Sequence, residues 1–200
     1  MKSNSKNLFA VLCLFMGLVV IVSHYLVQFP VKYLNLEEIL TYGAFTYPIT
    51  FLITDLANRS YGKKVAIKIV YIGFSIGVLL TLLVSTNFSD LISIRIAIGS
   101  GIAFLVAQTL DVQVFDRLRN NKVWFFAPFV SSLFGSTIDT LLFFFISFYK
   151  TGVPWVSLAF GDFTIKLLIA LLMLIPFRIL ISRVKDVSGK RYLKYKLNKS

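Results

Sequence analysis

Long apolar segments recur along the whole chain and limit what it can fold into. Five of them are long enough to cross a bilayer, since about 20 helical residues span the hydrocarbon core. At 57% hydrophobic residues, the chain has more apolar surface than one water-soluble core can bury. The sequence predicts an all-α integral membrane protein, a bundle of six transmembrane helices spanning about 8–28, 42–58, 65–86, 91–115, 124–149 and 155–181.

Basic residues are distributed unevenly among the connections between these segments. If the N-terminus is cytoplasmic, only Lys32 and Lys150 of the 21 Lys and Arg residues fall on the far side, and Arg95 and Lys166 fall within spans. Cytoplasmic connections carry an excess of Lys and Arg, so both termini are expected in the cytoplasm. We expect one membrane domain over 1–183 and a basic cytoplasmic tail over 184–200. The positive charge is explained by topology and requires no nucleic-acid partner.

Glycine and proline mark two features of the helices. The short second segment contains Gly43 and Pro48, which predicts a kinked or discontinuous helix. Broken helices build transporter sites because their freed backbone groups face a cavity. Gly73 and Gly77 have the spacing that lets two helices approach closely, and Gly99 is interpreted in the same way.

Ionisable side chains inside the membrane are the candidate functional groups. Each costs about 2.5–3.5 kcal/mol at a helix centre, so several together favour a function. Asp162 and Lys166 are four residues apart on one helical face and are expected to form a structural or gating ion pair. Arg95 is expected to pair with a carboxylate of another helix. Even then, two carboxylates lack a basic partner and must be protonated, hydrogen-bonded or available to a ligand. The four acids within spans are Asp55, Asp111, Asp139 and Asp162.

Polar residues accompany these acids at helical spacing. Gln108 lies three residues before Asp111, and Asp55 lies beside a stripe formed by Thr50, Thr54 and Asn58. Asp139 follows the small residues Ser132, Gly135 and Ser136, which could leave room for a flat ligand. Ser131 and Thr140, taken singly, are better explained as hydrogen-bond donors between helices.

Several kinds of site are absent from the sequence. Cys13 is the only cysteine and His24 the only histidine, so we expect neither a disulfide nor a metal site. No phosphate-binding loop and no Ser/His/Asp or Cys/His arrangement occurs, so neither an enzyme nor an ATPase is expected. No cofactor is expected either.

Four motifs in order resemble those of a known family. They are Tyr47-Pro48 with Thr54 to Lys63, Ala103 to Val112, Ser131 to Thr140 with Phe143-Phe144, and Gly161-Asp162-Phe163. Together they resemble the YhhQ/VUT family of bacterial queuosine precursor transporters. The resemblance covers most of the chain from the second to the sixth span. It implies multi-pass location in the bacterial inner membrane and import of 7-cyano-7-deazaguanine and 7-aminomethyl-7-deazaguanine for tRNA modification.

These substrates suggest roles for the polar residues. A guanine-like edge offers two neighbouring N–H donors, which one carboxylate can accept, and an aminomethyl cation would suit a second carboxylate. We expect Asp139 or Asp55 to hold the base edge. The other expected substrate-binding residues are Asn58, Gln108 and Asp111 as polar contacts, and Tyr47, Phe104 and Phe143 as stacking aromatics.

Other interpretations stay open at this point. The chain could transport another small planar or cationic solute such as a vitamin or nucleobase, and a non-transporting scaffold or a membrane enzyme is a more distant alternative. The family is thought similar to vitamin-binding subunits of energy-coupling-factor transporters, whose first helix often carries an Ala-xxx-Ala docking pattern. That pattern is absent between Leu8 and Gln28, which argues against an ATPase partner. The energy source and a homo-oligomer are left open.

Overall fold

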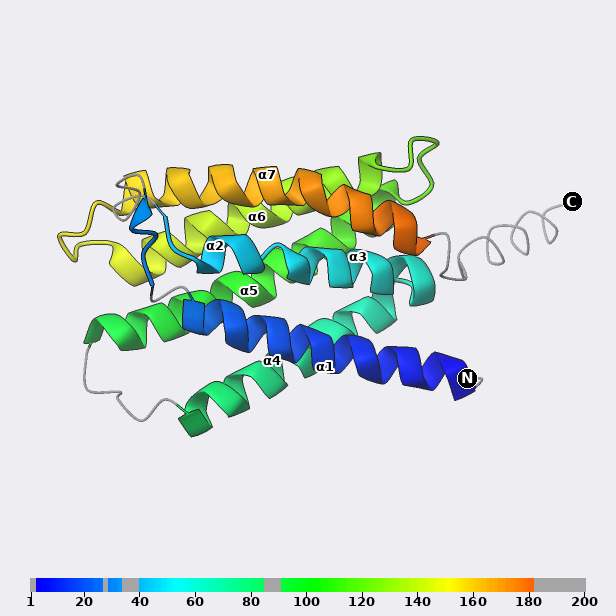
Figure 1. The fold of residues 1–200 in the computed structure, drawn as a ribbon, viewed down its shortest axis with the longest axis horizontal. Coiled ribbons are helices and arrows are strands. Elements are labelled where there is room, and N and C mark those ends of the chain that lie inside the picture. Colours follow the sequence, from blue (N-terminus) through cyan, green and yellow to red (C-terminus); the bar gives the residue numbers. More distant parts are fainter. Residues whose placement is uncertain (1–2, 27–28, 34–39, 85–90, 182–200) are drawn as a thin grey trace, which may run out of the picture.

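The described part of the protein is helical. A computed structural model describes residues 3–26, 29–33, 40–84 and 91–181, and the predicted tail at 184–200 lies outside them. Apart from an isolated bridge between Pro30 and Thr41, the regular structure of these residues is α-helix. The all-α prediction is confirmed for this part of the chain. The helices are α1 (Ser3–Leu26), α2 (Gly43–Thr46), α3 (Ile49–Tyr61), α4 (Lys63–Val84), α5 (Leu91–Leu118), α6 (Phe126–Phe148) and α7 (Trp155–Ile181) (Figure 1).

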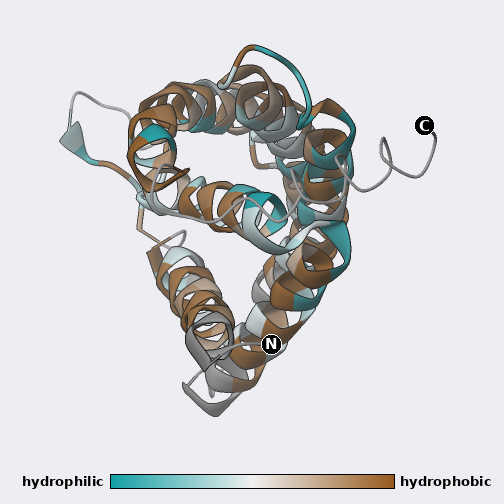
Figure 2. Ribbon diagram, turned by 90° about the vertical axis from the view of Figure 1, so that its right-hand side faces the viewer, coloured by the Kyte–Doolittle hydropathy of each residue, from teal (hydrophilic) through white to brown (hydrophobic). Residues whose placement is uncertain are grey.

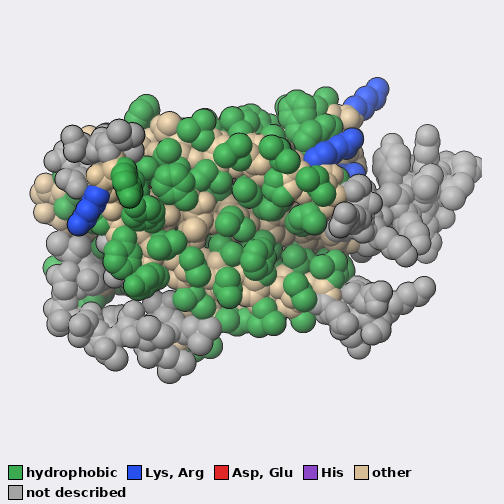
Figure 3. Space-filling model, in the orientation of Figure 1, with side chains coloured by type: hydrophobic (Ala, Val, Ile, Leu, Met, Phe, Trp, Pro, Cys, Tyr) green, Lys and Arg blue, Asp and Glu red, His purple; other side chains and the backbone are tan. Residues whose placement is uncertain are grey.

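The outer surface of the helices is that of a membrane protein. Among the described residues, three stretches are long and apolar enough to cross a bilayer, namely Ile94–Leu118, Phe126–Phe148 and Trp155–Ile181, while the apolar part of α1 is shorter. Large apolar side chains project outward, and Phe160 on α7 is 74% exposed. On the face drawn in Figure 3, hydrophobic side chains cover the middle of the molecule and Lys and Arg lie toward its ends. Such a continuous apolar surface is suited to lipid.

The predicted break in the second span lies between α2 and α3. Proline has no N–H and cannot continue the hydrogen-bond ladder, so α2 ends at Thr46 and α3 begins at Ile49, directly after Pro48. Tyr47 and Pro48 keep helical dihedral angles. The two helices therefore follow one another along nearly the same course in Figure 1, and the prediction of a kinked or discontinuous helix is confirmed.

Helix α3 is the centre of the bundle. It contacts α1, α4, α5, α6 and α7, and most of its side chains are buried. The buried side chains include polar ones, since Thr50, Thr54 and Asn58 are all 0% exposed. In Figure 2, which views the molecule along its long axis, most of the ribbon is hydrophobic with short hydrophilic stretches. The polar stripe predicted from the sequence therefore faces other helices.

The far end of α3 is fixed by a glycine and by two arginines. Gly62 has φ +85°, a conformation that favours glycine, and its N–H bonds to the Asn58 carbonyl at 2.8 Å before α4 begins. Arg59 Nη1 donates to the Arg119 carbonyl at 2.8 Å, and Arg119 Nη2 donates to the Arg59 carbonyl at 3.2 Å. This reciprocal pair holds the carboxyl ends of α3 and α5 together, where cations are favoured by the helix dipole.

Glycines allow α1 and α4 to pack closely. A Cβ atom at Gly73 would overlap the side chain of Met16, and one at Gly77 would come within 2.7 Å of Val20 Cγ1. On the other side of this contact, Gly17 lies against Ile76. Gly99 similarly faces Ser147 of α6. The predicted close packing at these glycines is confirmed, and it occurs within one chain.

Gly73→Leu should destabilise the α1–α4 contact. The added side chain has no space beside Met16, and such overpacking typically costs about 1–3 kcal/mol. Ser75→Leu on the exposed side of the same helix is the matched control and should change stability by less than about 0.5 kcal/mol. The measurement is thermal unfolding of both purified variants in one detergent. Equal unfolding temperatures would contradict the packing described here.

Candidate functional site

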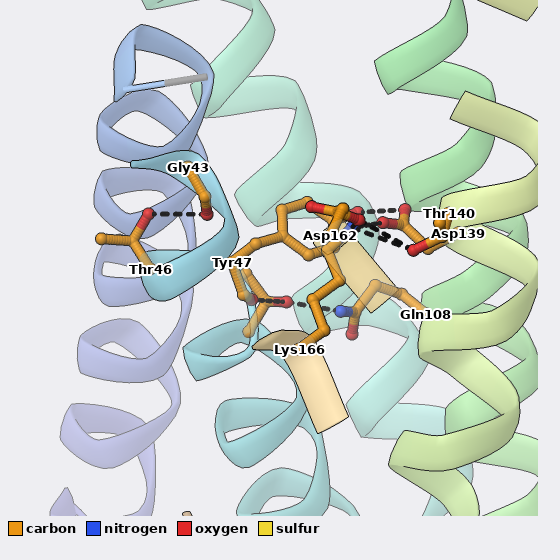
Figure 4. A network of polar contacts seen from close by, with 9 residues as sticks. Gly43, Thr46, Tyr47, Gln108, Asp139, Thr140, Asp162 and Lys166 are labelled. Atoms are coloured by element: carbon orange, nitrogen blue, oxygen red, sulfur yellow. Dashed lines mark hydrogen bonds and ion pairs between the residues drawn. The ribbon is translucent and has the colours of Figure 1, made fainter. Parts of the chain in front are cut away.

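A buried lysine lies at the centre of the main polar network. Lys166 Nζ on α7 is 2.8 Å from Asp139 Oδ2 of α6 and 2.5 Å from Asp162 Oδ2, one turn earlier on its own helix. The third neighbour is the Thr140 hydroxyl oxygen, at 3.4 Å. The lysine and both aspartates are at most 8% exposed. The predicted Asp162–Lys166 pair is confirmed, and Asp139 is added to it (Figure 4).

Tyr47 closes this network from the break before α3. Its hydroxyl donates to Asp139 Oδ1 at 2.7 Å, so both oxygens of that carboxylate are engaged. The ring lies beneath the lysine, with Nζ 4.9 Å from the ring centroid, a cation–π distance. Thr140 donates to Asp162 Oδ2 at 2.8 Å. We call Tyr47, Asp139, Thr140, Asp162 and Lys166 the ammonium network.

Gln108 connects α5 to the same region. Its Nε2 donates to Thr50 Oγ1 at 2.6 Å, and the Thr50 hydroxyl in turn donates to the Tyr47 carbonyl at 2.7 Å. Gln108 is 0% exposed, and its Oε1 has no hydrogen-bond partner among the described residues. A buried acceptor without a partner is costly unless a ligand or water uses it.

A second group of acids lies between α3, α5 and α6. Thr54 donates to Asp111 Oδ2 at 2.9 Å, and Ser131 donates to Asp55 Oδ1 at 3.2 Å. The two carboxylates are 0% and 2% exposed. Their described hydrogen-bond partners are hydroxyl groups. Thr54, Asp55, Asp111 and Ser131 are called the carboxylate cluster below.

Unpartnered acceptors also occur in and beside the carboxylate cluster. Within the described residues, neither Asp111 Oδ1 nor Asn58 Oδ1 has a hydrogen-bond partner, although Asn58 Nδ2 donates to the Val112 carbonyl at 2.8 Å. Both side chains are fully buried. Gln108 lies three residues before Asp111 on α5, so two of these acceptors belong to successive turns of one helix face.

The small residues before Asp139 do not leave open space at Gly135. A Cβ atom there would come within 2.6 Å of the Phe51 ring and 3.3 Å of Asp111 Cβ, so α3 and α5 already fill the position. Ser136 is 1% exposed, and its hydroxyl has no partner among the residues described. The glycine therefore serves close helix packing rather than room for a flat ligand at this point.

The predicted stacking aromatics lie in different surroundings. Tyr47 and Phe104 meet edge to face at 6.0 Å between ring centroids, and Phe74 stacks on Phe104 at 5.5 Å. Phe104 thus borders the ammonium network through Tyr47. Phe143 instead belongs to an apolar cluster with Phe144 and Ala103, between α5, α6 and α7.

Arg95 does not join these acids. Its Nε and Nη2 donate to the Ile146 carbonyl at 3.1 and 2.9 Å, and Nη2 also donates to the Tyr149 carbonyl at 2.9 Å. The expected pairing with a carboxylate of another helix is replaced, in the part of the chain described, by these carbonyl contacts. The last carbonyls of a helix lack intrahelical donors, so the carboxyl end of α6 offers a strong site for a guanidinium.

Sequence spacing missed the contacts made between helices. Lys166 to Asp139, Tyr47 to Asp139 and Gln108 to Thr50 each join residues far apart in the chain. In the sequence, the only sign that Tyr47 would take part in this network was its position directly before Pro48. The roles expected for Ser131 and Thr140 as donors between helices are confirmed.

Comparison with known proteins places the chain in a family. Residues 41–181 match the family model described as "Putative vitamin uptake transporter". The chain is also 36% identical over 200 residues to the queuosine precursor transporter of Escherichia coli (strain K12), covering 88% of this chain and 90% of that protein. The chain belongs to the YhhQ/VUT family. This confirms the resemblance found in the motifs.

Two further relatives have related names. A "Probable queuosine precursor transporter" of Haemophilus influenzae is 38% identical over 154 residues, 68% of this chain and 66% of that one. A protein of Bacillus subtilis with the same name is 31% identical over 158 residues, 67% of this chain and 68% of the relative. No solved structure matches the chain.

Thr140→Val should weaken the α6–α7 contact. The substitution keeps the shape but removes the hydrogen bond to Asp162, and an unsatisfied buried partner typically costs about 1–3 kcal/mol. Thr164→Val is the control, because Thr164 is exposed on α7 and bonds to the Phe160 carbonyl of its own helix. Thermal unfolding in detergent should separate the two variants. If Thr140→Val lowers the unfolding temperature no more than Thr164→Val does, the hydrogen bond between Thr140 and Asp162 does not stabilise the fold.

Proposed function

We propose that this protein imports queuosine precursors, 7-cyano-7-deazaguanine and 7-aminomethyl-7-deazaguanine, for tRNA modification. The observation that carries the proposal is the near full-length similarity to the queuosine precursor transporter of Escherichia coli. The family description mentions vitamins, whereas all three relatives are named for queuosine precursors, which favours these substrates over a vitamin or nucleobase. In this proposal the protein is a transporter and not an enzyme.

We propose six crossings of the bacterial inner membrane, formed by α1, the joined pair α2 and α3, α4, α5, α6 and α7. The start of α1 and the end of α7 lie at the same end of the molecule (Figure 1), as an even number of crossings requires. Arg59 and Arg119 lie at the carboxyl ends of α3 and α5, which reach the same end. The excess of Lys and Arg there supports a cytoplasmic side. The absence of the Ala-xxx-Ala pattern between Leu8 and Gln28 supports transport without an ATPase subunit.

The base edge of the substrate is assigned to α5 and its neighbours. Gln108 Oε1 and Asp111 Oδ1 are buried acceptors without described partners, and Asn58 Oδ1 is a third. A deazaguanine base presents adjacent N–H donors, and such donors are what unpartnered acceptors can bind. Asp139 is less suited to this role, because Tyr47 and Lys166 already occupy its oxygens. Asp55 is proposed to support Asp111 through the carboxylate cluster.

Aromatic contacts to the substrate base are proposed at the Tyr47 end of this region. Tyr47 belongs to the ammonium network and Phe104 meets its ring edge to face, so they are better placed to contact a flat base than Phe143, which packs in an apolar cluster. Entry of a ligand among these buried groups requires movement of helices. The break between α2 and α3 supplies a point where the chain can bend, since no Pro48 N–H holds the ladder together.

Uptake into cells unable to make the precursors tests the function. Labelled 7-cyano- and 7-aminomethyl-7-deazaguanine should accumulate only when the chain is expressed, and unlabelled vitamins or nucleobases should not compete. Repeating the assay with a proton-gradient uncoupler reports the energy source. If neither base accumulates although the protein is present in the membrane, the proposal is refuted.

Asp111→Asn should reduce uptake of both precursors at least about tenfold. The substitution replaces a carboxylate acceptor by an amide, and losing one buried charged hydrogen bond typically costs 2 kcal/mol or more. Asp116→Asn on the same helix, outside the carboxylate cluster, is the matched control and should keep uptake near the wild-type level. Initial rates at equal membrane abundance are the measurement. Unchanged rates for Asp111→Asn would remove this residue from the substrate site.

A further inference from the structure

The ammonium network has one positively charged side chain and two carboxylates. Lys166 is its single cation, while Asp139 and Asp162 are two carboxylates, and the three side chains are at most 8% exposed. With all three ionised, the network carries a net charge of minus one. An uncompensated charge is expensive in a protein interior and more so at bilayer depth. A second cation would remove the imbalance.

The surroundings of Lys166 Nζ form a complete site for a primary ammonium. Its three N–H donors face Asp139 at 2.8 Å, Asp162 at 2.5 Å and the Thr140 hydroxyl at 3.4 Å, and the Tyr47 ring lies 4.9 Å below. Carboxylates, a hydroxyl and an aromatic face recognise any ligand ammonium in the same way. The ammonium now in this site belongs to the protein only because the side chain of Lys166 carries it.

The two carboxylates hold the lysine in different ways. Asp162 is on the same helix face, four residues before Lys166, so this pair persists in any arrangement that keeps α7 helical. Asp139 is on α6, and its contact with Lys166 depends on how α6 and α7 lie against each other. The lysine side chain is long and rotatable. It can therefore leave Asp139 without leaving Asp162.

We propose that Lys166 is a tethered counter-ion that occupies the site of a ligand's primary ammonium, and that such a ligand takes its place at Asp139 and Tyr47. Lys166 then remains with Asp162, each carboxylate has one cation, and the net charge of the network becomes zero. No bond is made or broken in this exchange. The inference rests on the proposed function, since 7-aminomethyl-7-deazaguanine carries the ammonium and 7-cyano-7-deazaguanine does not.

The exchange makes Asp139 a residue that determines specificity. The two precursors share the same base, so contacts to Gln108 and Asp111 affect both alike. Asp139→Asn leaves Lys166 and Asp162 as a neutral pair and removes the carboxylate offered to the ligand ammonium. We expect the uptake of the aminomethyl compound to fall at least about tenfold relative to that of the cyano compound. Retained uptake of the cyano compound shows that the variant is folded.

The first experiment measures this ratio in cells. Initial uptake rates of both labelled precursors are compared between wild type, Asp139→Asn and the control Asp116→Asn, each normalised to protein in the membrane. A ratio that falls in Asp139→Asn alone supports the proposal. An unchanged ratio, with both compounds still taken up, overturns it. If the wild type accumulates neither compound, the proposed function fails, and the ammonium site is judged by the second experiment.

The second experiment uses purified full-length protein and does not depend on transport. Lys166→Ala removes the tethered cation and leaves space for a small amine in its place. Propylammonium should raise the thermal unfolding temperature of Lys166→Ala by more than that of the wild type, in which Lys166 competes for the site, while propanol of similar size should raise neither. The exposed variant Lys68→Ala is the matched control for the loss of a lysine. No specific rise with propylammonium in a Lys166→Ala protein that unfolds cooperatively overturns the ammonium site.

Discussion

A single buried ammonium group links three separate parts of this bundle. Lys166 on α7 reaches Asp139 on α6 and lies over the ring of Tyr47 at the break before α3, while Asp162 holds it from its own helix. A cation in an apolar environment is stable only when its partners stay close. The relative positions of α6, α7 and the α2–α3 junction are therefore coupled through one side chain. Any movement that opens this region must supply Lys166, Asp139 or Asp162 with new partners.

The second acid group is stabilised by different chemistry. Asp55 and Asp111 accept hydrogen bonds from Ser131 and Thr54, so the described donors are neutral hydroxyls. The protein thus contains a region with a buried cation and a neighbouring region whose buried acceptors have no partner among the described residues, and Gln108 and Thr50 join the two. A flat base with donors on one edge and an ammonium on a short arm would match both regions. This match connects the proposed substrates with the proposed exchange at Lys166.

The rest of the bundle is packed in a way that leaves movement to this region. Gly73 brings α1 and α4 into close contact, and the reciprocal contacts of Arg59 and Arg119 join the ends of α3 and α5. Such close contacts resist sliding of helices past each other. The junction at Pro48 lacks one backbone hydrogen bond and lies next to the ammonium network. Bending is therefore expected there before it occurs at the glycine contact.

The sequence alone determined the helices, the break at Pro48, the close packing at Gly73 and the pairing of Asp162 with Lys166. These features depend on local spacing, since residues three or four apart share a helix face and an imino acid interrupts the ladder wherever it occurs. The motifs also identified the family. Roles for Ser131 and Thr140 followed from the need of a buried hydroxyl for a partner.

Only the tertiary structure decided which helix faces which. It added Asp139 and Tyr47 to the lysine, directed Arg95 to the carbonyls at the end of α6, and placed the Phe51 ring against Gly135. These contacts depend on the rotation and offset of each helix, which result from the packing of all side chains at once. Spacing within one helix contains no information about that offset. The sequence showed that acids are buried within the helices. Their partners could be assigned only from the packed bundle.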